Sequence, residues 1–238
     1  MALASLREIA ERAESENANL FFDSSTILVQ HLLDISLESL SRNIEHYLHF
    51  VERPNTFTVS GFSKEFKDLM DYFGRATEGI YEESELKPVR KNLADLIKLA
   101  RNKKYSPHES VGIIFHKPDD RVLYSELERE SKSFRNSSGR PIDESYRQLL
   151  IAAYYGSINR DSASYIISSL EVVEHYFNVF HRNMLNSRQL TPKLSNVISQ
   201  YGGLASHPVS VYIFSPERKK FEQRGTTSNE TPAQAVYP

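Results

Sequence analysis

The chain has 238 residues, a formal net charge of −2 and no cysteine. Hydrophobic residues make up 39% of the sequence and charged residues 25%, which permits a sizeable core and argues against global disorder. The absence of cysteine excludes disulfides, thiolate catalysis and cysteine-ligated zinc. The first 20 residues carry charges too closely spaced for a signal peptide, and no apolar run is long enough to span a bilayer. We therefore expect a cytoplasmic protein without a membrane anchor.

The first quarter of the chain predicts two helices separated by a short strand. Apolar residues at three-to-four spacing indicate an amphipathic helix over residues 3–15, within an N-terminal segment 1–18. The run "NLFF" is too short for a helix and predicts a buried strand that ends at Asp23. A helical pattern then runs over about 26–52 and stops at "RPN".

The middle of the chain continues with the strand-like "TFTVSGF" and with "SKEFKDLMDYF", whose apolar residues share one helical face. Residues 84–104 predict another amphipathic helix, in which seven basic residues stand against two acidic ones. "SVGIIFH" at 110–116 predicts a strand, and the polar residues 117–140 predict an exposed helix and loop. "PIDESYRQLLIAAYYG" begins with a helix-entry signal and ends on glycine, so it predicts a complete short helix.

The last third predicts two strands around a helix. "SYIIS" is typical of a buried strand, "SLEVVEHYFNVFHRNML" of a helix, and "HPVSVYIFSPER" of a last strand closed by Pro216. From about residue 222 the apolar content is too low for folding, so we predict a disordered tail over 222–238. Short apolar strands that alternate with helices predict an α/β fold whose mainly parallel sheet is covered on both faces.

Acidic residues stand where the predicted strands end or helices begin. In open α/β sheets, the ligand crevice lies outside the carboxyl ends of the strands. Asp23 follows the first strand, where it is either a crevice carboxylate or a helix cap. Glu65 lies at the edge of an apolar helix face, and Asp143 begins a helix whose dipole favours an acid there. Glu171 follows "YIISS" and has capping-box spacing to Ser168.

Taken together, these acids point to one chemistry. Carboxylates that converge at the edge of a sheet repel one another unless a cation lies among them, and Mg²⁺ or Mn²⁺ prefers such oxygen ligands. A site of this kind orients a phosphodiester and lowers the pKa of a bound water. The pattern therefore predicts metal-dependent hydrolysis of nucleic acid.

The sequence at this point resembles the PIN-domain ribonuclease family. The resemblance lies in "FFDSS", "SGFSKEF", "DESYRQLLIAA", "YIISSLEVV" and "VSVYIFSPERKKF", spread over about 20–221. It implies a PIN-like three-layer fold over 19–221, with a central, mainly parallel sheet, helices on both faces and a helical insertion at about 84–140. It also implies a Mg²⁺- or Mn²⁺-dependent endoribonuclease, and it allows a homodimer.

The family's acidic set falls here on Asp23, Glu65, Asp143 and Glu171. The resemblance implies that Asp23, Asp143 and Glu171 hold the metal, with Asp161 of "NRDSA" as a substitute for the last, while Glu65 orients a water or supports a second ion. Ser25 and Ser169 would be supporting hydroxyls. We expect the RNA phosphates to be bound by a basic set, which consists of Lys87, Arg90, Lys91, Lys98 and Arg101.

Other interpretations stay open at this point. Glu171 stands where the family usually has Asp, which favours a PIN-like scaffold that has lost its metal and binds RNA or a protein partner. The basic helix is equally explained as a solvated face. Tyr154 and Tyr155 could stack on bases or pack in the core. No pair among the eight histidines has a strong zinc signature, and four of them lie in amphipathic helices: His46, His49, His175 and His181.

A second enzyme interpretation comes from "SRNIEHYLH". Arg42, Asn43 and His49 have the spacing found in HEPN-type ribonucleases, which act without metal. Those domains are all-helical, whereas strands are predicted here. A small-molecule α/β enzyme has less support, because no glycine-rich phosphate loop follows a strand and no nucleophile elbow is present.

Overall fold

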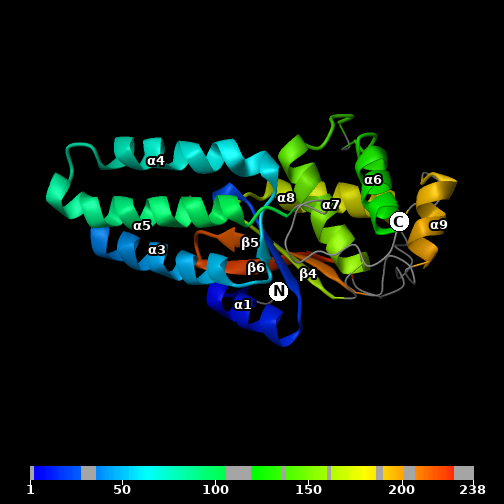
Figure 1. Cartoon of the computed structure of the whole chain (residues 1–238), viewed down its shortest axis with the longest axis horizontal. Helices are drawn as coiled ribbons and strands as arrows, with labels where there is room; N and C mark the ends of the chain where they lie inside the picture. Colours follow the sequence, from blue (N-terminus) through cyan, green and yellow to red (C-terminus); the bar gives the residue numbers. More distant parts are fainter. Residues whose placement is uncertain are drawn as a thin grey trace, which may run out of the picture.

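Helices enclose a central sheet on both faces (Figure 1). Helices α1 and α3 pack on one face of the sheet, and α7 and α8 pack on the other. Strands β2 and β4 are buried along their whole lengths, as the apolar runs predict for strands covered from both sides. The computed structural model describes residues 3–27, 36–105, 119–135, 138–159, 162–185, 190–200 and 207–227.

Within these residues, six strands form one mixed sheet in the order β1-β6-β5-β4-β2-β3. Strands β3, β2, β4 and β5 run parallel to one another, whereas β6 is antiparallel to β5, and β1 is antiparallel to β6. The predicted α/β class is therefore confirmed, with an antiparallel edge added to the parallel core. The strands are β1 Leu3–Ala4, β2 Asn19–Phe22, β3 Thr56–Phe57, β4 Ser164–Ser168, β5 Val209–Ser215 and β6 Lys220–Thr226.

The order of the parallel strands reverses beside β2. The chain passes from β2 to β3 on one side, and then crosses to β4 on the other side. Phe22 and Ile167 are register partners, so the carboxyl ends of β2 and β4 lie next to each other. Such a reversal leaves a crevice at the carboxyl ends of the strands, which is where α/β proteins bind ligands. Asp23 and Ser168 stand at this position.

The helices follow the amphipathic patterns of the sequence. Helix α1 begins with a capping box, in which Ser5 and Glu8 exchange hydrogen bonds. In the part of the chain that the structure covers, no helix is both long and apolar enough to cross a membrane. The helices are α1 Leu6–Ser15, α3 Leu37–Glu52, the 3-10 helix η1 Ser60–Phe62, α4 Ser63–Thr77, α5 Glu83–Asn102, α6 Asp119–Ser131, α7 Glu144–Asn159, α8 Val172–Leu185 and α9 Pro192–Gln200.

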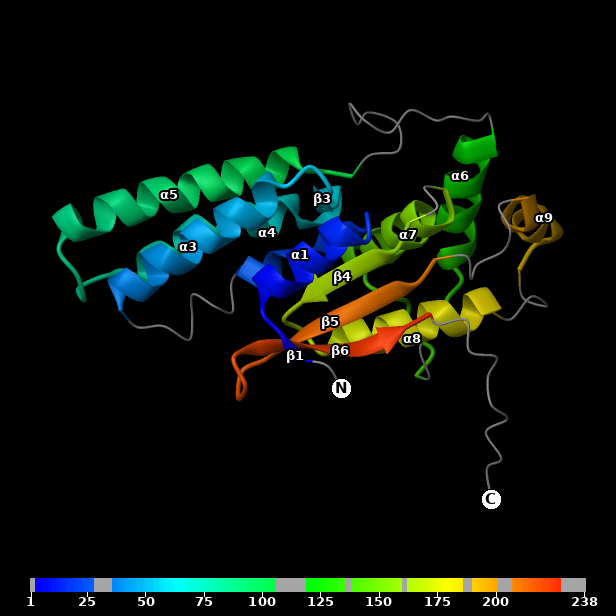
Figure 2. The ribbon, with the colours of Figure 1, turned by 90° about the horizontal axis from the view of Figure 1, so that it is seen from below.

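Helices α3, α4 and α5 form a helical arm that extends to one side of the sheet (Figures 1 and 2). Leu93 and Leu96 of α5 are buried and belong to the same hydrophobic core as the strands, as do Leu123 and Leu127 of α6. Where the structure describes it, the segment predicted as an insertion, 84–140, thus shares its buried side chains with the core of the sheet.

The tail prediction needs a correction at its start. Strand β6 runs to Thr226, beyond the predicted boundary at residue 222. Backbone pairing with β5 orders this segment, and the buried Glu222 is neutralised by Arg218 at 3.0 Å and Arg224 at 2.7 Å. Low apolar content therefore does not exclude a strand that is added to an existing edge.

Some predicted elements fall outside the described residues, namely the strand 110–116, residues 28–35 of the predicted helix 26–52 and the tail beyond residue 227.

Candidate functional site

Asp23 follows directly after β2 and precedes a short helical stretch, 24–27, and its side chain is fully buried. Its Oδ1 accepts hydrogen bonds from the Ser25 hydroxyl at 2.7 Å and from the Thr26 backbone N–H at 3.0 Å, and the Thr26 hydroxyl lies 2.8 Å away. Its Oδ2 accepts a hydrogen bond from the Ser168 hydroxyl at 2.6 Å. The carboxylate is therefore a helix cap and also a bridge to the neighbouring strand. We call the hydroxyls of Ser25, Thr26 and Ser168 the hydroxyl cradle.

The end of β4 holds the hydroxyl cradle in place. The Ser168 and Ser25 oxygens lie 3.3 Å apart, and the backbone N–H groups of Ser169 and Leu170 donate to Ser25 and Ser168, each at 3.1 Å. Ser25 therefore contacts Asp23, as the supporting role predicted for it requires. Ser169 supports the site through its backbone, since its own buried hydroxyl has no hydrogen-bond partner among the described residues.

Burial raises the pKa of Asp23 above its ordinary value of 3.8, while the hydrogen bonds from Ser168, Ser25 and Thr26 lower it in part. The charge on Asp23 also reaches Tyr47, whose pKa is raised first by burial and then by this carboxylate. Across the described residues, Asp23, Glu65 and Asp143 form no ion pair with a Lys, Arg or His side chain. The described part of the protein thus supplies no direct counter-charge to this acidic group.

The raised pKa of Asp23 gives a pH dependence with a definite sign. The folded chain holds the Asp23 proton to a higher pH than the unfolded chain, so this group contributes stability below pH 3.8, and that contribution is lost as the pH rises through the folded-state pKa. We expect the Asp23→Asn variant, in chelator, to gain free energy of unfolding relative to wild type as the pH rises from 3.8 to neutrality. Urea denaturation over this range measures the difference, with the exposed Asp71→Asn as control. A constant difference across the range would contradict the burial argument.

Glu65 reaches the same place from the first turn of α4. The Ser24 hydroxyl donates a hydrogen bond to its Oε2. Burial raises the pKa of Glu65, the bond from Ser24 lowers it, and the charges of Asp23, Asp143 and Asp68 raise it further. The structure therefore brings Glu65 within electrostatic reach of two of the other three predicted acids, Asp23 and Asp143.

Asp143 is exposed and caps helix α7. Its Oδ1 accepts a hydrogen bond from the Ser145 N–H at 3.0 Å, and its carbonyl oxygen accepts one from the Arg147 N–H at 2.8 Å. The helix-start interpretation is thus confirmed for Asp143. The same position also puts its charge within reach of Glu65.

Tyr146 is a residue of this site that the sequence analysis missed. Burial raises the pKa of its phenol, and the charges of Asp23, Glu65 and Asp143, with a hydrogen bond to Asp23, raise it further. Its ring packs against Phe62, with centroids 5.3 Å apart. The sequence feature that could have identified Tyr146 is its spacing of three residues from Asp143, which puts both side chains on one helix face.

A close approach between η1 and α7 sets the positions of Glu65 and Asp143. The Gly61 N–H donates to Gln148 Oε1 at 3.2 Å, and a Cβ atom on Gly61 would lie 2.8 Å from Ser145 Cα. Real Cβ atoms do not come this near to backbone, so the contact requires glycine. Gly61 thus lets the first turns of α4 and α7 meet beside Asp23.

The fourth predicted acid is not brought to Asp23. Glu171 is exposed between β4 and α8, and its backbone carbonyl accepts a hydrogen bond from the Glu174 N–H at 3.1 Å. The capping box expected with Ser168 is not formed, because the Ser168 hydroxyl oxygen accepts the backbone N–H of Leu170 rather than that of Glu171, while its O–H donates to Asp23. A role for Glu171 in metal binding stays a prediction. Its predicted substitute, Asp161, lies outside the described residues.

The described acids around Asp23 do not form a closed cage for a metal ion. No three His, Cys, Asp or Glu side chains among the described residues lie close enough together to hold a metal ion. Mg²⁺ is usually bound by one or two carboxylates, with waters and substrate phosphates as its other ligands. Asp23 and Glu65 carry oxygens of this type, and both oxygens of Asp23 already accept hydrogen bonds from the hydroxyl cradle.

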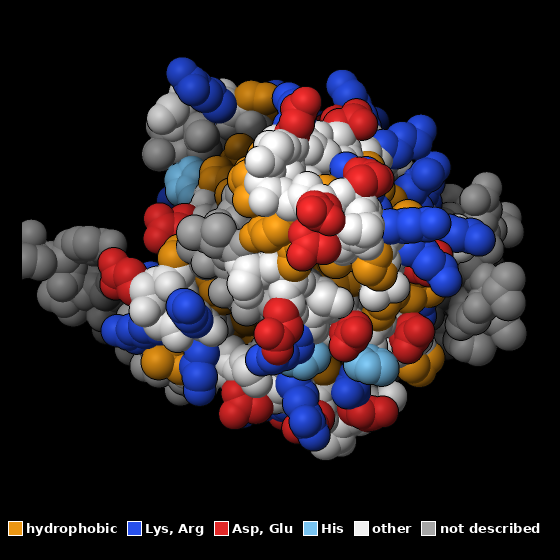
Figure 3. Space-filling model, turned by 90° about the vertical axis from the view of Figure 1, so that its left-hand side faces the viewer, with side chains coloured by type: hydrophobic (Ala, Val, Ile, Leu, Met, Phe, Trp, Pro, Cys, Tyr) orange, Lys and Arg blue, Asp and Glu red, His pale blue; other side chains and the backbone are white. Residues whose placement is uncertain are grey.

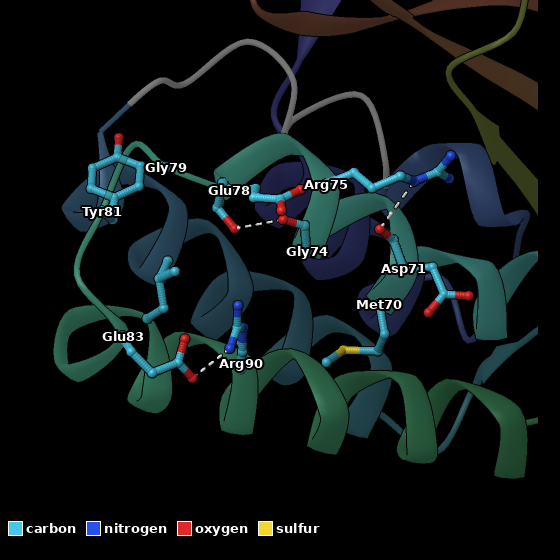
Figure 4. A pocket seen from close by; sticks show the side chains of 11 residues that line it. Met70, Asp71, Gly74, Arg75, Glu78, Gly79, Tyr81, Glu83 and Arg90 are labelled. Atoms are coloured by element: carbon cyan, nitrogen blue, oxygen red, sulfur yellow. Dashed lines mark hydrogen bonds and ion pairs between the residues drawn. The ribbon is translucent and has the colours of Figure 1, made fainter.

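The predicted basic set lies on α5. Lys87, Lys91, Lys98 and Arg101 are exposed, and the described residues contain no ion pair for any of them. Arg90 differs, because it forms an ion pair with Glu83 at 2.5 Å inside a hollow of about 730 Å³ between α4 and α5 (Figure 4). The end of the molecule that lies at left in Figure 1 carries acidic side chains among the basic ones (Figure 3).

The aromatic and histidine candidates have structural contacts. Tyr154 and Tyr155 are buried, so they pack in the core and do not offer a surface for bases. The Tyr154 hydroxyl lies 2.8 Å from His181 Nδ1, and burial lowers the pKa of that histidine. His175 is exposed on α8.

The HEPN interpretation conflicts with the fold, because HEPN domains are all-helical and this chain has a six-stranded sheet. Arg42 forms an ion pair with Glu38 at 2.9 Å, whereas Asn43 and His49 line a groove between α1 and α3.

Comparisons of this chain with protein-family models, with curated proteins and with solved structures find no match.

Proposed function

We propose that this protein is a PIN-like endoribonuclease that uses Mg²⁺ or Mn²⁺ to hydrolyse RNA phosphodiester bonds. The observation that carries the proposal is the fully buried Asp23 at the strand-order reversal, next to Glu65 and Asp143, with no ion-pair partner in the described residues. A buried carboxylate without a counter-charge is costly, and a bound cation removes that cost.

The residues of the chain would have separate tasks in this reaction. Asp23 and Glu65 would hold the ion, which supplies Lewis-acid chemistry and a bound water of lowered pKa. The hydroxyl cradle would keep the carboxylate of Asp23 in one orientation, because its hydrogen bonds contact both carboxylate oxygens. Asp143 carries its charge at the mouth of the site, and Glu171 would add a further ligand if its segment turned inward.

Substrate binding is the second part of the proposal. The exposed cations Lys87, Lys91, Lys98 and Arg101 would attract RNA phosphates, with a contribution that weakens as salt increases. Arg90 has a smaller part, because its charge is neutralised by Glu83. The proposal keeps the cytoplasm as the compartment, since a chain without cysteine needs no oxidising environment.

A catalytically inactive PIN-like scaffold, which binds RNA or a protein partner, is the second candidate. The observation in its favour is that no three acidic or histidine side chains gather into one metal-binding group among the described residues. The two candidates differ in their response to divalent ions.

The test is cleavage of a fluorescently labelled single-stranded RNA, together with thermal unfolding, in Mn²⁺, in Mg²⁺ and in EDTA. The nuclease proposal expects cleavage that needs the ion and stops in EDTA, and a melting temperature that rises with ion concentration. Cleavage that persists in EDTA would contradict it. No effect of either ion on cleavage or melting would also contradict it, and would favour the inactive scaffold.

A further inference from the structure

A groove of about 800 Å³ lies between α1, α3 and the turn that joins β5 to β6. It shares no residue with the site around Asp23. Helices α1 and α3 lie side by side on the face of the sheet opposite α7 (Figure 1). A volume of this size is in the range of pockets that hold small organic ligands. We call this feature the α1–α3 groove.

The floor of the α1–α3 groove is apolar. Leu6 and Ala10 of α1 face Phe50 of α3 and Phe221 of β6. A bare inorganic ion would leave such a floor without contacts, because apolar surface is favourably covered by an apolar or aromatic body. The floor therefore indicates a ligand with a flat or apolar part.

The rim of the groove carries cations from three different elements, together with the carboxylates of Glu11 and Glu45. Arg7 comes from α1, Arg53 from the end of α3, and Lys219 from the β5–β6 turn. Arg7 forms an ion pair with Glu11 at 2.7 Å, and Arg53 forms one with Glu14 at 2.6 Å. Each guanidinium has further N–H donors beyond those that contact the carboxylate.

Lys219 is the rim cation whose charge is not neutralised. In the described part of the chain no ion pair involves it, whereas the adjacent Arg218 is bound to Glu222. Its backbone has a positive φ of 50°, which fixes the sharp turn from which its side chain lines the groove. The ammonium is thus available for an anion.

Helix α3 adds planar side chains along one face. Asn43, His46 and His49 follow one another at intervals of three residues and all line the groove. Imidazole and guanidinium planes stack on aromatic rings, and imidazole nitrogens offer hydrogen bonds to ring edges. This face is suited to a heteroaromatic ring.

We propose that the α1–α3 groove binds a nucleoside 5′-phosphate. The base lies over the apolar floor beside the His46 and His49 rings, and the phosphate is bound by Lys219 and Arg53. The inference does not depend on nuclease activity, because no residue of the groove belongs to the acidic site. A free mononucleotide and the 5′-phosphate end of an RNA carry the same chemistry, so both are arms of the test.

Isothermal titration of the full chain with AMP tests the proposal, with adenosine and inorganic phosphate as partial ligands. We expect 1:1 binding of AMP, and affinities at least about tenfold weaker for adenosine and for phosphate. Lys219→Asn should weaken AMP binding about tenfold while it keeps a residue that tolerates positive φ. His46→Gln should also weaken it. The exposed Lys220→Asn is the matched control and should bind as wild type does.

Three results would overturn the proposal: no saturable AMP binding, adenosine binding as tight as AMP binding, or unchanged affinity in Lys219→Asn. Competition by tetranucleotides with and without a 5′-phosphate identifies the source of the ligand. If the phosphorylated tetranucleotide displaces AMP and the hydroxyl form does not, the groove takes RNA ends. If neither displaces it, the groove takes free mononucleotides. All titrations are made in EDTA, so failure of the nuclease proposal does not affect them.

Discussion

Replacing Asp23 by Asn is expected to abolish metal-dependent RNA cleavage while the protein stays folded. Asn has the same shape but no charge, so it removes the ligand that the proposal assigns to the cation. A bound ion contributes several kcal/mol of transition-state stabilisation, so the cleavage rate should fall at least about a hundredfold. Folding should persist because the buried charge that is lost had no ion-pair partner among the described residues.

The measurement compares cleavage rates and ion-dependent melting shifts of wild type and variant. Asp143→Asn extends the test, because Asn still caps a helix while the negative charge is lost. A loss of activity in Asp143→Asn would thus report on charge rather than on the start of α7. Asp71→Asn, on the exposed face of α4, is the control. Full activity in both Asp23→Asn and Asp143→Asn would refute the assignment of the acidic site.

Gly61→Ala is expected to destabilise the fold through the addition of a single methyl group. The new Cβ would lie 2.8 Å from Ser145 Cα, which is a backbone atom and cannot rotate away. Forcing extra atoms into a packed contact costs about 1–3 kcal/mol. For a chain of this size, each kcal/mol lowers the melting temperature by about 2–4 °C. Because η1 and α7 must separate, Glu65 moves relative to Asp143, and we expect cleavage to fall as well.

Gly74→Ala is the matched control for this substitution. Gly74 lies within α4, and a Cβ atom there meets nothing within 4 Å. Alanine at an unobstructed helix position stabilises by about 0.5–1 kcal/mol. Thermal unfolding should therefore move in opposite directions for the two variants. Equal melting temperatures for Gly61→Ala and wild type would show that the contact between η1 and α7 is not close in solution.

The local sequence was sufficient to place Asp23 but not to find what holds it. A short apolar run followed by Asp and three hydroxyls predicts the end of a strand and the beginning of a helix, and both are present. The partner hydroxyl of Ser168 lies 145 residues further along the chain. The spacing between Ser168 and Glu171 also matches a capping box, so the local pattern did not show that Ser168 binds Asp23. The pairing of β2 with β4 is what brings Ser168 to Asp23.

Two elements owe their stability to partners that the sequence pattern does not show. Helix α5 is rich in charge, yet its buried face belongs to the hydrophobic core. Strand β6 is poor in apolar residues, yet a neighbouring strand satisfies its backbone. In both cases stability comes from a tertiary partner that a single-sequence pattern does not contain. Tyr146 was missed for the same reason, since its proximity to Asp23 depends on how α7 packs.

The pairing of β1 with β6 has a consequence for biosynthesis. Leu3 and Ala4 bond to Glu222 and Phe221, so the earliest described strand has its partner near the end of the described chain. During translation β1 is made long before β6, so it cannot join the sheet until the chain has been synthesised past residue 222. Contacts of such large sequence separation form late. Closure of this edge is therefore a late folding step, and a nascent chain arrested before residue 220 would have β1 without its partner strand.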